Sequence, residues 1–440
     1  MSIAHYLSAV RNADLVRRTG KVSQFFGLVV ESIGPDVFVG EVCQIYSRLQ
    51  GTPVNAEVVG LKDGKVLLMP YGELRGISLG SEVIATGFPL QIPIGEGLLG
   101  RVIDAFGQPI DGKPAPALSK FHQLKVAPLN PLSRAKISEI LETGVRSIDT
   151  LLTLGHGQRM GIFSGSGVGK STLLGMIARN VCADINVIAL IGERGREVRD
   201  FIDKSLGPEG LARSVVVVAT SDQPALVRSR AAYAATAIAE FFREQGRNVM
   251  LIMDSITRFA MAQREIGLSV GEPPTARGYT PSVFATLPKL VERCGTSDNG
   301  GSITALYTVL VEGDDLNDPI SDTMRSILDG HIVLSRELAN HGHYPAIDVL
   351  NSTSRLLVDL VHKDQRKLIQ QAISILSSYE KNKQMVEIGA YRHGTHPELD
   401  NAIQTMPKLD QFLCQDMDHR IRRSDALVDL AELLGQGGLQ

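Results

Sequence analysis

The 440-residue chain contains no tryptophan and only four cysteines, and aromatic residues make up 5% of it. The cysteines are widely separated and form no Cys-x-x-Cys pair; they are Cys43, Cys182, Cys294 and Cys414. Disulfide frameworks and cysteine-based zinc sites usually need several closely spaced cysteines, so this pattern argues against both. It favours a protein of the reducing cytoplasm.

Strong net charge and long apolar runs are also missing. The formal net charge is −3, so no field of the whole chain favours nucleic acid as a partner. No apolar run approaches the ~18 residues that a membrane-spanning helix needs. The first residues, MSIAHYLSAVRNADLVRR, lack the basic-then-apolar order of a signal peptide. The remaining composition, 43% hydrophobic and 21% charged, is typical of a globular protein with two or three domains.

Residues 1–21 form a segment of their own in the pattern. Ile3, Tyr6, Leu7 and Val10 would share one face of an amphipathic helix, and several basic residues follow them. We expect this segment to pack on its own protein or to bind a partner. Peripheral association with a membrane surface stays open as the alternative.

Three further regions follow, each with its own periodicity. Residues 22–92 contain short Val- and Ile-rich runs separated by turn residues, at the spacing of a small β-barrel. Residues 93–345 are predicted to form the next domain, which begins with a Pro/Gly-rich bridge. From about residue 145, apolar runs such as INVIALI alternate with helical stretches, which favours a mainly parallel sheet covered by helices. Residues 346–440 carry apolar residues at three- and four-residue steps, which predicts a helical domain. The predicted fold class is an α/β core with an N-terminal β-barrel and C-terminal helices.

A phosphate-binding loop is predicted where the strand RMGIF leads into the helix TLLGMIARN. The pattern G-x-x-x-x-G-K-[ST] curls the backbone so that its N–H groups face phosphate oxygens. Ser164 stands here in place of the first glycine. We expect Lys170 to contact the β- and γ-phosphates of ATP, and Ser171 to bind Mg²⁺. The predicted nucleotide-binding residues of this segment are Ser164, Gly165, Ser166, Gly167, Val168, Gly169, Lys170, Ser171 and Thr172.

Two carboxylates follow apolar strands of the predicted sheet. Asp254 closes the run NVMLIMD, and ligands of α/β sheets bind at this carboxyl edge, so we expect Asp254 to help bind Mg²⁺. Glu193 follows the run INVIALIG and is delivered to the same edge. Because ATP hydrolysis needs a group that positions or deprotonates water, we assign Glu193 to that task. A Glu193 that only forms an ion pair is the alternative.

Two histidine pairs could suggest a metal site, His341 with His343 and His393 with His396. Neither has a cysteine or carboxylate nearby at a convincing metal-binding spacing, and both lie in turn-rich stretches. We therefore expect them to be ordinary turn histidines.

Several long motifs resemble one known family. PAIDVLNSTSR (345–355) resembles the signature of the rotary ATP synthase α/β-type catalytic family. GERGREVRDF (192–201), ARGYTPSVFATLPKLVERCG (276–295) and VLVEGDDLNDPISDTMRSILDGHIVLSRELA (309–339) are similar to segments of its type III export ATPases. The match extends from about residue 22 to the end of the chain and is nearest to the flagellar members.

The resemblance implies a β-barrel, a RecA-like nucleotide domain and a helical domain, assembled as a homohexamer with ATP sites between subunits. It implies that Glu193 is the catalytic glutamate and that Arg194 and Arg258 are active-site arginines. It also implies that Tyr344 stacks on adenine and that Arg355 is an arginine finger for the neighbouring subunit's γ-phosphate. Without the resemblance, Tyr344 would fit a core position and Arg355 a solvated surface.

The implied activity is Mg²⁺-dependent ATP hydrolysis that energises flagellar type III protein export at the cytoplasmic face of the inner membrane. The implied partners are a stator-like regulator at the N-terminus, a coiled-coil central stalk, export chaperones with their substrates, and the membrane export gate. An injectisome ATPase is the main alternative. A non-catalytic ring subunit usually has Gln at the position of Glu193, and an ATP synthase β subunit usually has GERTREG instead of GERGREV, so both are less favoured.

Overall fold

The computed structural model of this chain describes residues 17–47, 52–311, 313, 315 and 317–435. The amphipathic helix expected near the N-terminus lies almost entirely outside these residues. The chain divides into two compact units, the first comprising Met1–Gln91, Pro224–Val227 and Gln263–Pro281. The second comprises Ile92–Gln223, Arg228–Ala262 and Ser282–Gln440, and it contains every predicted site residue.

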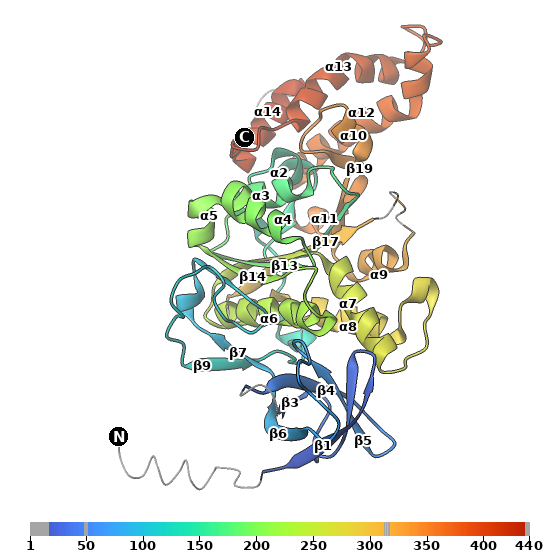
Figure 1. Cartoon of the computed structure of the whole chain (residues 1–440). Helices are drawn as coiled ribbons and strands as arrows, with labels where there is room; N and C mark the ends of the chain where they lie inside the picture. The colour runs from blue at the N-terminus through green and yellow to red at the C-terminus, as the bar shows by residue number, and fades with distance from the viewer. Residues whose placement is uncertain (1–16, 48–51, 312, 314, 316, 436–440) are drawn as a thin grey trace. The chain divides into compact units, whose positions relative to one another are not determined.

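The first unit is built on a closed, antiparallel six-stranded barrel with the order β1-β2-β5-β4-β3-β6. Small and β-branched side chains alternate into its core, among them Val30, Ala56 and Val58. The strands, drawn in blue in Figure 1, are β1 (Thr19–Phe26), β2 (Val29–Ile33), β3 (Glu41–Ile45), β4 (Val54–Lys62), β5 (Lys65–Pro70) and β6 (Glu82–Pro89).

Strand β1 is the part of the barrel that sequence patterning missed. Its sequence TGKVSQFF is largely polar and exposed, and Val22 is its one hydrophobic residue in the barrel core. The strand nevertheless pairs with both β2 and β6 and so closes the barrel. Pairing of this kind is decided by distant partners and leaves little trace in local periodicity.

The second unit is built on a nine-stranded sheet with the order β19-β18-β12-β17-β15-β13-β14-β8, and β16 pairs beside β17. The interior pairs are parallel, while β19 runs antiparallel to β18. The strands are β8 (Arg101–Ile103), β12 (Arg159–Ser164), β13 (Ile185–Ile191), β14 (Ser214–Ala219), β15 (Asn248–Asp254), β16 (Gly295–Thr296), β17 (Ser302–Leu310), β18 (Gly330–Leu334) and β19 (Ile347–Ser354). Two small two-stranded sheets join β7 (Gln91–Ile94) to β9 (Lys120–Gln123) and β10 (Ile140–Leu141) to β11 (Leu154–Gly155).

The runs predicted as buried strands form the middle of this sheet, and β13 is buried along its whole length. Helices cover both faces: α3, α4 and α5 lie on one side of the sheet in Figure 1, and α6 and α8 lie on the other. Their bounds are α3 (Lys170–Asn180), α4 (Gly195–Asp200), the π-helix η3 (Phe201–Leu206), α5 (Gly207–Ala212), α6 (Ala225–Glu244), α7 (Ile256–Ser269) and α8 (Pro281–Val291).

The C-terminal part is helical, as the three- and four-residue spacing predicts. Its helices are α12 (Lys363–Glu387), α13 (Pro397–Leu413) and α14 (Arg423–Leu433), and the shorter helices of the unit are α2 (Arg146–Leu151), α9 (Pro319–Ile327), α10 (Arg336–Asn340) and α11 (Leu357–Leu360). Buried residues of α12 and α13, such as Leu368 and Phe412, belong to the same hydrophobic core as Ile148 of α2. Strand β19 lies beyond residue 345, where the sequence suggested that the sheet ends.

The fold class predicted from the sequence is confirmed: a closed barrel, a mainly parallel sheet covered by helices, and a helical C-terminal part. Among the described residues, no helix is both long and apolar enough to span a bilayer.

Candidate functional site

Three predicted site residues meet at the carboxyl ends of the central parallel strands. Ser164 ends β12, Asp254 ends β15, and Glu193 follows β13 by two residues. Strand β17 lies between β12 and β15, and β13 lies next to β15. Because parallel strands present their carboxyl ends at one edge, the fold itself gathers these residues.

The loop between β12 and α3 has the backbone of a phosphate cradle. Gly167 and Gly169 adopt positive φ angles of 77° and 90°, which side chains other than glycine rarely tolerate. No atom lies within 4 Å of the position that a Cβ on Gly167 would take, so the loop stays open on that side. Val168 is buried and anchors the loop, while Ser166 is exposed. Ser164 Oγ is buried without a hydrogen-bond partner among the described residues.

Lys170 is the first residue of α3, and its ammonium group joins the two carboxylates. Lys170 Nζ forms a short ion pair with Asp254 Oδ1 and lies 3.5 Å from Glu193 Oε1. Burial disfavours its charge, but the two carboxylates outweigh burial and raise the pKa of Lys170. The lysine is therefore held charged at the place where phosphate oxygens are expected.

Glu193 has a strongly perturbed carboxyl group. Burial and the negative charge of Asp254 raise the pKa of Glu193 to about 7, and Lys170 offsets this only in part. A carboxylate with a pKa near neutrality is suited to accept a proton from water at physiological pH. Perturbation of this kind, at a sheet edge that binds ligands, is typical of a catalytic group.

This pKa gives a pH prediction. If ionised Glu193 is required, kcat/KM for ATP should rise about tenfold per pH unit below about 7 and level off above it. Steady-state ATPase assays at low ATP across the neutral range measure this profile. A kcat/KM that is flat through pH 7 would contradict the assignment of Glu193.

Asp254 is oriented by a residue that the sequence analysis did not single out. Thr308 Oγ1 donates a hydrogen bond of 2.6 Å to Asp254 Oδ1, and both side chains are buried. Thr308 is a polar residue inside the otherwise apolar end of β17, LYTVL, and that interruption was the available signal. The carboxylate is thus fixed before any ligand arrives.

The residues present fit a divalent cation. When Glu193 is ionised, it and Asp254 share the single ammonium group of Lys170, so one negative charge remains to be balanced. The hydroxyl of Ser171, in the first turn of α3, and the carboxylate of Asp254 are oxygen donors of the kind that Mg²⁺ prefers.

The two predicted active-site arginines have different environments. The aliphatic stem of Arg258 packs against Gly192, next to Glu193, and its Nε is buried without a hydrogen-bond partner among the described residues. Arg194 instead is 83% exposed at the side chain, with Glu197 3.9 Å away. The stem of Arg258 therefore lies against the residue before Glu193, whereas the side chain of Arg194 faces solvent.

Tyr344 lies against the phosphate loop. A Cβ on Gly169 would come within 3.3 Å and 3.4 Å of two atoms of the Tyr344 ring, so glycine is needed where the two meet. Tyr344 is 46% exposed as a residue, so its aromatic side chain is accessible to a stacking partner. Arg336, which the sequence analysis missed, donates from Nη1 to the Ser166 carbonyl oxygen at 3.3 Å. It lines a cavity of 290 Å³ together with Ser164 and Gly165.

Arg355 is not part of this cluster. Strand β19 pairs with β18 so that Ile347 lies opposite Leu334, at the phosphate-loop end, and Ser354 lies opposite Gly330, at the other end. A strand rises about 3.3 Å per residue, so the length of β18 alone separates the ends by about 13 Å. Arg355 is exposed and donates to the Arg325 carbonyl oxygen at 3.0 Å. Within one chain, it is therefore too far away to serve the loop.

A phosphate loop, a paired carboxylate and lysine, and a parallel sheet with these elements at its carboxyl edge define a P-loop nucleotide-binding protein. Three family models match the chain: the ATP synthase alpha/beta family β-barrel domain (22–87), its nucleotide-binding domain (144–354), and the T3SS EscN ATPase C-terminal domain (361–432). The chain belongs to the ATP synthase alpha/beta family, together with flagellum-specific ATP synthases and type 3 secretion system ATPases.

Individual relatives cover nearly the whole chain. The "Flagellum-specific ATP synthase" of Bacillus subtilis (strain 168) is 54% identical over 99% of both chains. The "Type 3 secretion system ATPase" of Xanthomonas euvesicatoria is 50% identical over 91% of both. A solved structure of the assembled ATPase EscN from enteropathogenic E. coli, in complex with its central stalk EscO, is 42% identical. It matches with a TM-score of 0.87 over 94% of this chain and all of that one.

Proposed function

We propose that the chain is a Mg²⁺-dependent ATPase that energises type III protein export in the flagellar apparatus. The observation that carries the proposal is the contact of Lys170 with both Glu193 and Asp254 at the end of the phosphate loop. A non-catalytic nucleotide-binding subunit would need Lys170 and Asp254 but not a half-buried carboxylate with a pKa of about 7.

Each group has a separate task in hydrolysis. The loop N–H groups and Lys170 hold the β- and γ-phosphates, which fixes the γ-phosphorus for in-line attack. Ionised Glu193 orients the attacking water and, as a general base, accepts its proton. Arg258, whose stem packs against Gly192, would offset negative charge that develops on the γ-phosphate oxygens.

Mg²⁺ would be held by Ser171 and Asp254. When bound, it would neutralise charge on the β- and γ-phosphate oxygens. Thr308 keeps Asp254 in place for this role.

The complete site is proposed to form between subunits of a homohexamer. Arg355 lies at the end of β19 opposite to the phosphate loop of its own chain, so it can reach only the loop of a neighbour. Tyr344, at the other end of the same strand, would stack on the adenine bound to its own chain. The exposed Arg194 is likewise assigned to the active site, where it faces outward from its own subunit.

The flagellar system is favoured over an injectisome by the identity of 54% to the flagellar relative, against 50% to the secretion relative.

The proposal also names the partners of the chain. EscN binds a central stalk, EscO, and we propose a coiled-coil stalk for this chain as well. The other proposed partners are a stator-like regulator that binds the N-terminal segment, chaperone–substrate complexes and the membrane export gate. The enzyme would act at the cytoplasmic face of the inner membrane, with peripheral membrane contact.

Domain limits are part of the proposal. They are 1–21 for the partner-binding segment, 22–92 for the barrel, 93–345 for the nucleotide domain and 346–440 for the helical domain. Family models for the barrel, nucleotide and helical parts match at 22–87, 144–354 and 361–432, which supports three regions in this order.

The dependence of specific activity on protein concentration tests the proposal. If Arg355 completes a neighbour's site, ATPase rate per subunit with Mg²⁺ should rise steeply as the chain assembles, and light scattering on the same samples should report the ring. Absence of turnover at concentrations where the ring forms and ATP binds would favour a non-catalytic subunit. A rate per subunit that stays constant while the chain converts from monomer to ring would remove the role of Arg355.

A further inference from the structure

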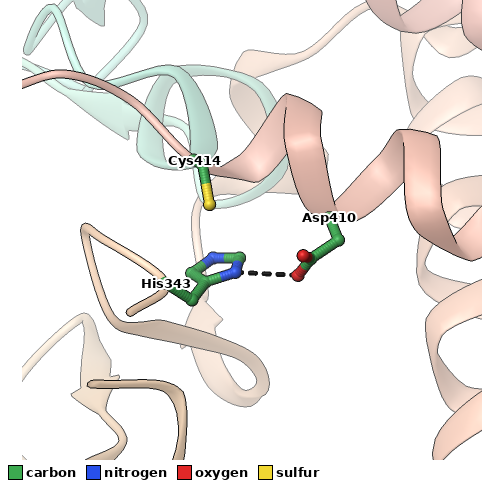
Figure 2. A group of neighbouring side chains, drawn as sticks. All are labelled: His343, Asp410 and Cys414. Atoms are coloured by element: carbon green, nitrogen blue, oxygen red, sulfur yellow. Dashed lines mark hydrogen bonds and ion pairs between the residues drawn. The ribbon is translucent and has the colours of Figure 1, made fainter. Parts of the chain in front are cut away.

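A cluster of metal-ligand side chains lies outside the nucleotide site. Figure 2 shows His343, from the loop between α10 and β19, facing Asp410 and Cys414, from the end of α13. His343 Nδ1 and Asp410 Oδ1 are 2.8 Å apart. One potential ligand atom from each of the three residues lies within 4.8 Å of the other two. Because His343 and Asp410 are 67 residues apart, no local pattern connects the histidine with the two helix residues.

The two helix residues are brought together by helical geometry. Asp410 and Cys414 are four residues apart, so their side chains lie one above the other on the same face. The main-chain N–H of Cys414 donates to the Asp410 carbonyl oxygen at 3.1 Å and closes the last turn of α13. The pattern D-x-x-x-C at a helix end is therefore a local signal for half of the cluster.

Main-chain hydrogen bonds hold the histidine loop against this helix end. The N–H of Gln415 donates to the Tyr344 carbonyl oxygen at 2.9 Å. Burial and the neighbouring Asp410 carboxylate raise the pKa of the Cys414 thiol. His343 itself is buried, with 6% exposure. The protein itself therefore holds the three side chains close together, without a bound ion.

We propose that His343, Asp410 and Cys414 bind a thiophilic divalent cation of the Zn²⁺ class, with water at a fourth position. Imidazole nitrogen, thiolate sulfur and carboxylate oxygen are the ligands that Zn²⁺ takes in proteins. Metal–ligand bonds of about 2.0–2.3 Å put ligand atoms of a tetrahedral site roughly 3.3–3.8 Å apart. The ligand atoms of the cluster lie within 4.8 Å of one another, somewhat farther apart than in such a site. Small side-chain rotations would bring them to these distances, since Asp410 is half exposed and can adjust.

The charges and protons of this site balance. Binding converts the Cys414 thiol to a thiolate and releases its proton to water. The thiolate and the Asp410 carboxylate then carry two negative charges, which match a divalent cation. The alternative is that His343 and Asp410 only form a hydrogen-bonded pair and bind no metal. In that case Cys414 would take no part in the cluster. Mg²⁺ would not compete, because it selects oxygen ligands.

The site adjoins the proposed adenine contact. Tyr344 directly follows His343, and its ring lies beside Gly169 of the phosphate loop. A cation bound to His343 would stiffen the segment that carries the ring. We therefore expect Zn²⁺ to change the KM for ATP more than kcat, an effect that rests on the proposed ATPase function, whereas cation binding itself does not.

Cobalt supplies a direct test. The full-length chain, freed of metal by chelation, would be titrated with Co²⁺, which reports thiolate ligation by a near-ultraviolet charge-transfer band. We expect one equivalent of Co²⁺ per chain with this band, displaced by Zn²⁺, and loss of the band in Cys414→Ser. Cys182→Ser removes an exposed cysteine elsewhere and should keep it. Asp410→Asn should weaken binding by about tenfold or more.

Stability provides the second measurement. Zn²⁺ should raise the unfolding temperature of the wild-type chain and of Cys182→Ser, but not of Cys414→Ser, because only a ligand of the folded state stabilises it. Equal unfolding temperatures of the metal-free variants would show that Cys414→Ser still folds. A charge-transfer band that survives in Cys414→Ser, or that never forms in the wild type, would overturn the proposal whatever the ATPase assays give.

Discussion

Replacing Glu193 with glutamine should lower the ATPase rate by roughly 10²–10⁴-fold, the usual contribution of a general base. Glutamine keeps the size of the side chain but cannot accept a proton from the attacking water. ATP should bind at least as tightly as before, since the substitution removes a negative charge that lies 3.5 Å from Lys170. Single-turnover hydrolysis and binding of a fluorescent ATP analogue measure the two effects separately.

The matched control is Glu209→Gln, which makes the same change on the exposed surface of α5 and should leave both measurements unchanged. Nearly wild-type turnover in Glu193→Gln would mean that another group activates water. Loss of ATP binding together with turnover would instead assign Glu193 a role in holding the loop. The pH profile of the wild type provides an independent check, because the same carboxyl group sets its position.

Replacing Arg355 with alanine should lower turnover by about 10³–10⁵-fold, the range found for arginine fingers, without loss of ATP binding. The side chain is exposed and lies at the far end of β19 from its own phosphate loop, so the folded subunit should be preserved. Arg392→Ala, another exposed arginine, is the control and should keep activity. ATPase rates at concentrations above assembly measure the effect.

A mixing experiment decides whether Arg355 acts across an interface. Arg355→Ala and Glu193→Gln subunits should each be inactive alone. Mixed at equal amounts and allowed to exchange, they would form interfaces in which one subunit supplies Glu193 and its neighbour supplies Arg355. Random mixing makes about a quarter of the interfaces of a ring complete in this way, so activity should return. If the mixture stays inactive although the subunits co-assemble, Arg355 does not serve a neighbour.

Local sequence patterns predicted the middle of the sheet and the phosphate loop well. The Val- and Ile-rich runs are buried on both faces, so their composition alone marks them as strands. The loop needs glycine at fixed steps, and Gly167 and Gly169 adopt the positive φ angles that explain this need. Asp254 and Glu193 could be placed together because parallel strands share a carboxyl edge.

Features that depend on long-range contacts were missed. Arg336 contacts the phosphate loop from a helix 170 residues away, and Thr308 supports Asp254 across 54 residues. Contacts between residues so far apart in the sequence leave no periodic pattern in either local segment. Tyr344 and Arg355 were found only by family resemblance. An aromatic residue before a proline, or an arginine after a strand, occurs in many proteins and does not by itself indicate a nucleotide site. The structure adds what resemblance did not give, the location of the two at opposite ends of β19.

That location has a geometric consequence. If, as proposed, the nucleotide binds at one end of β19 and Arg355 serves a neighbour from the other end, each subunit has a donor side and an acceptor side. Identical copies must then join head to tail. An open arc of such subunits always ends in one loop that has no finger and one finger that has no loop. Any gap in the ring, whether left during assembly or made by a lockwasher-like opening, would therefore silence one site while the others stay complete.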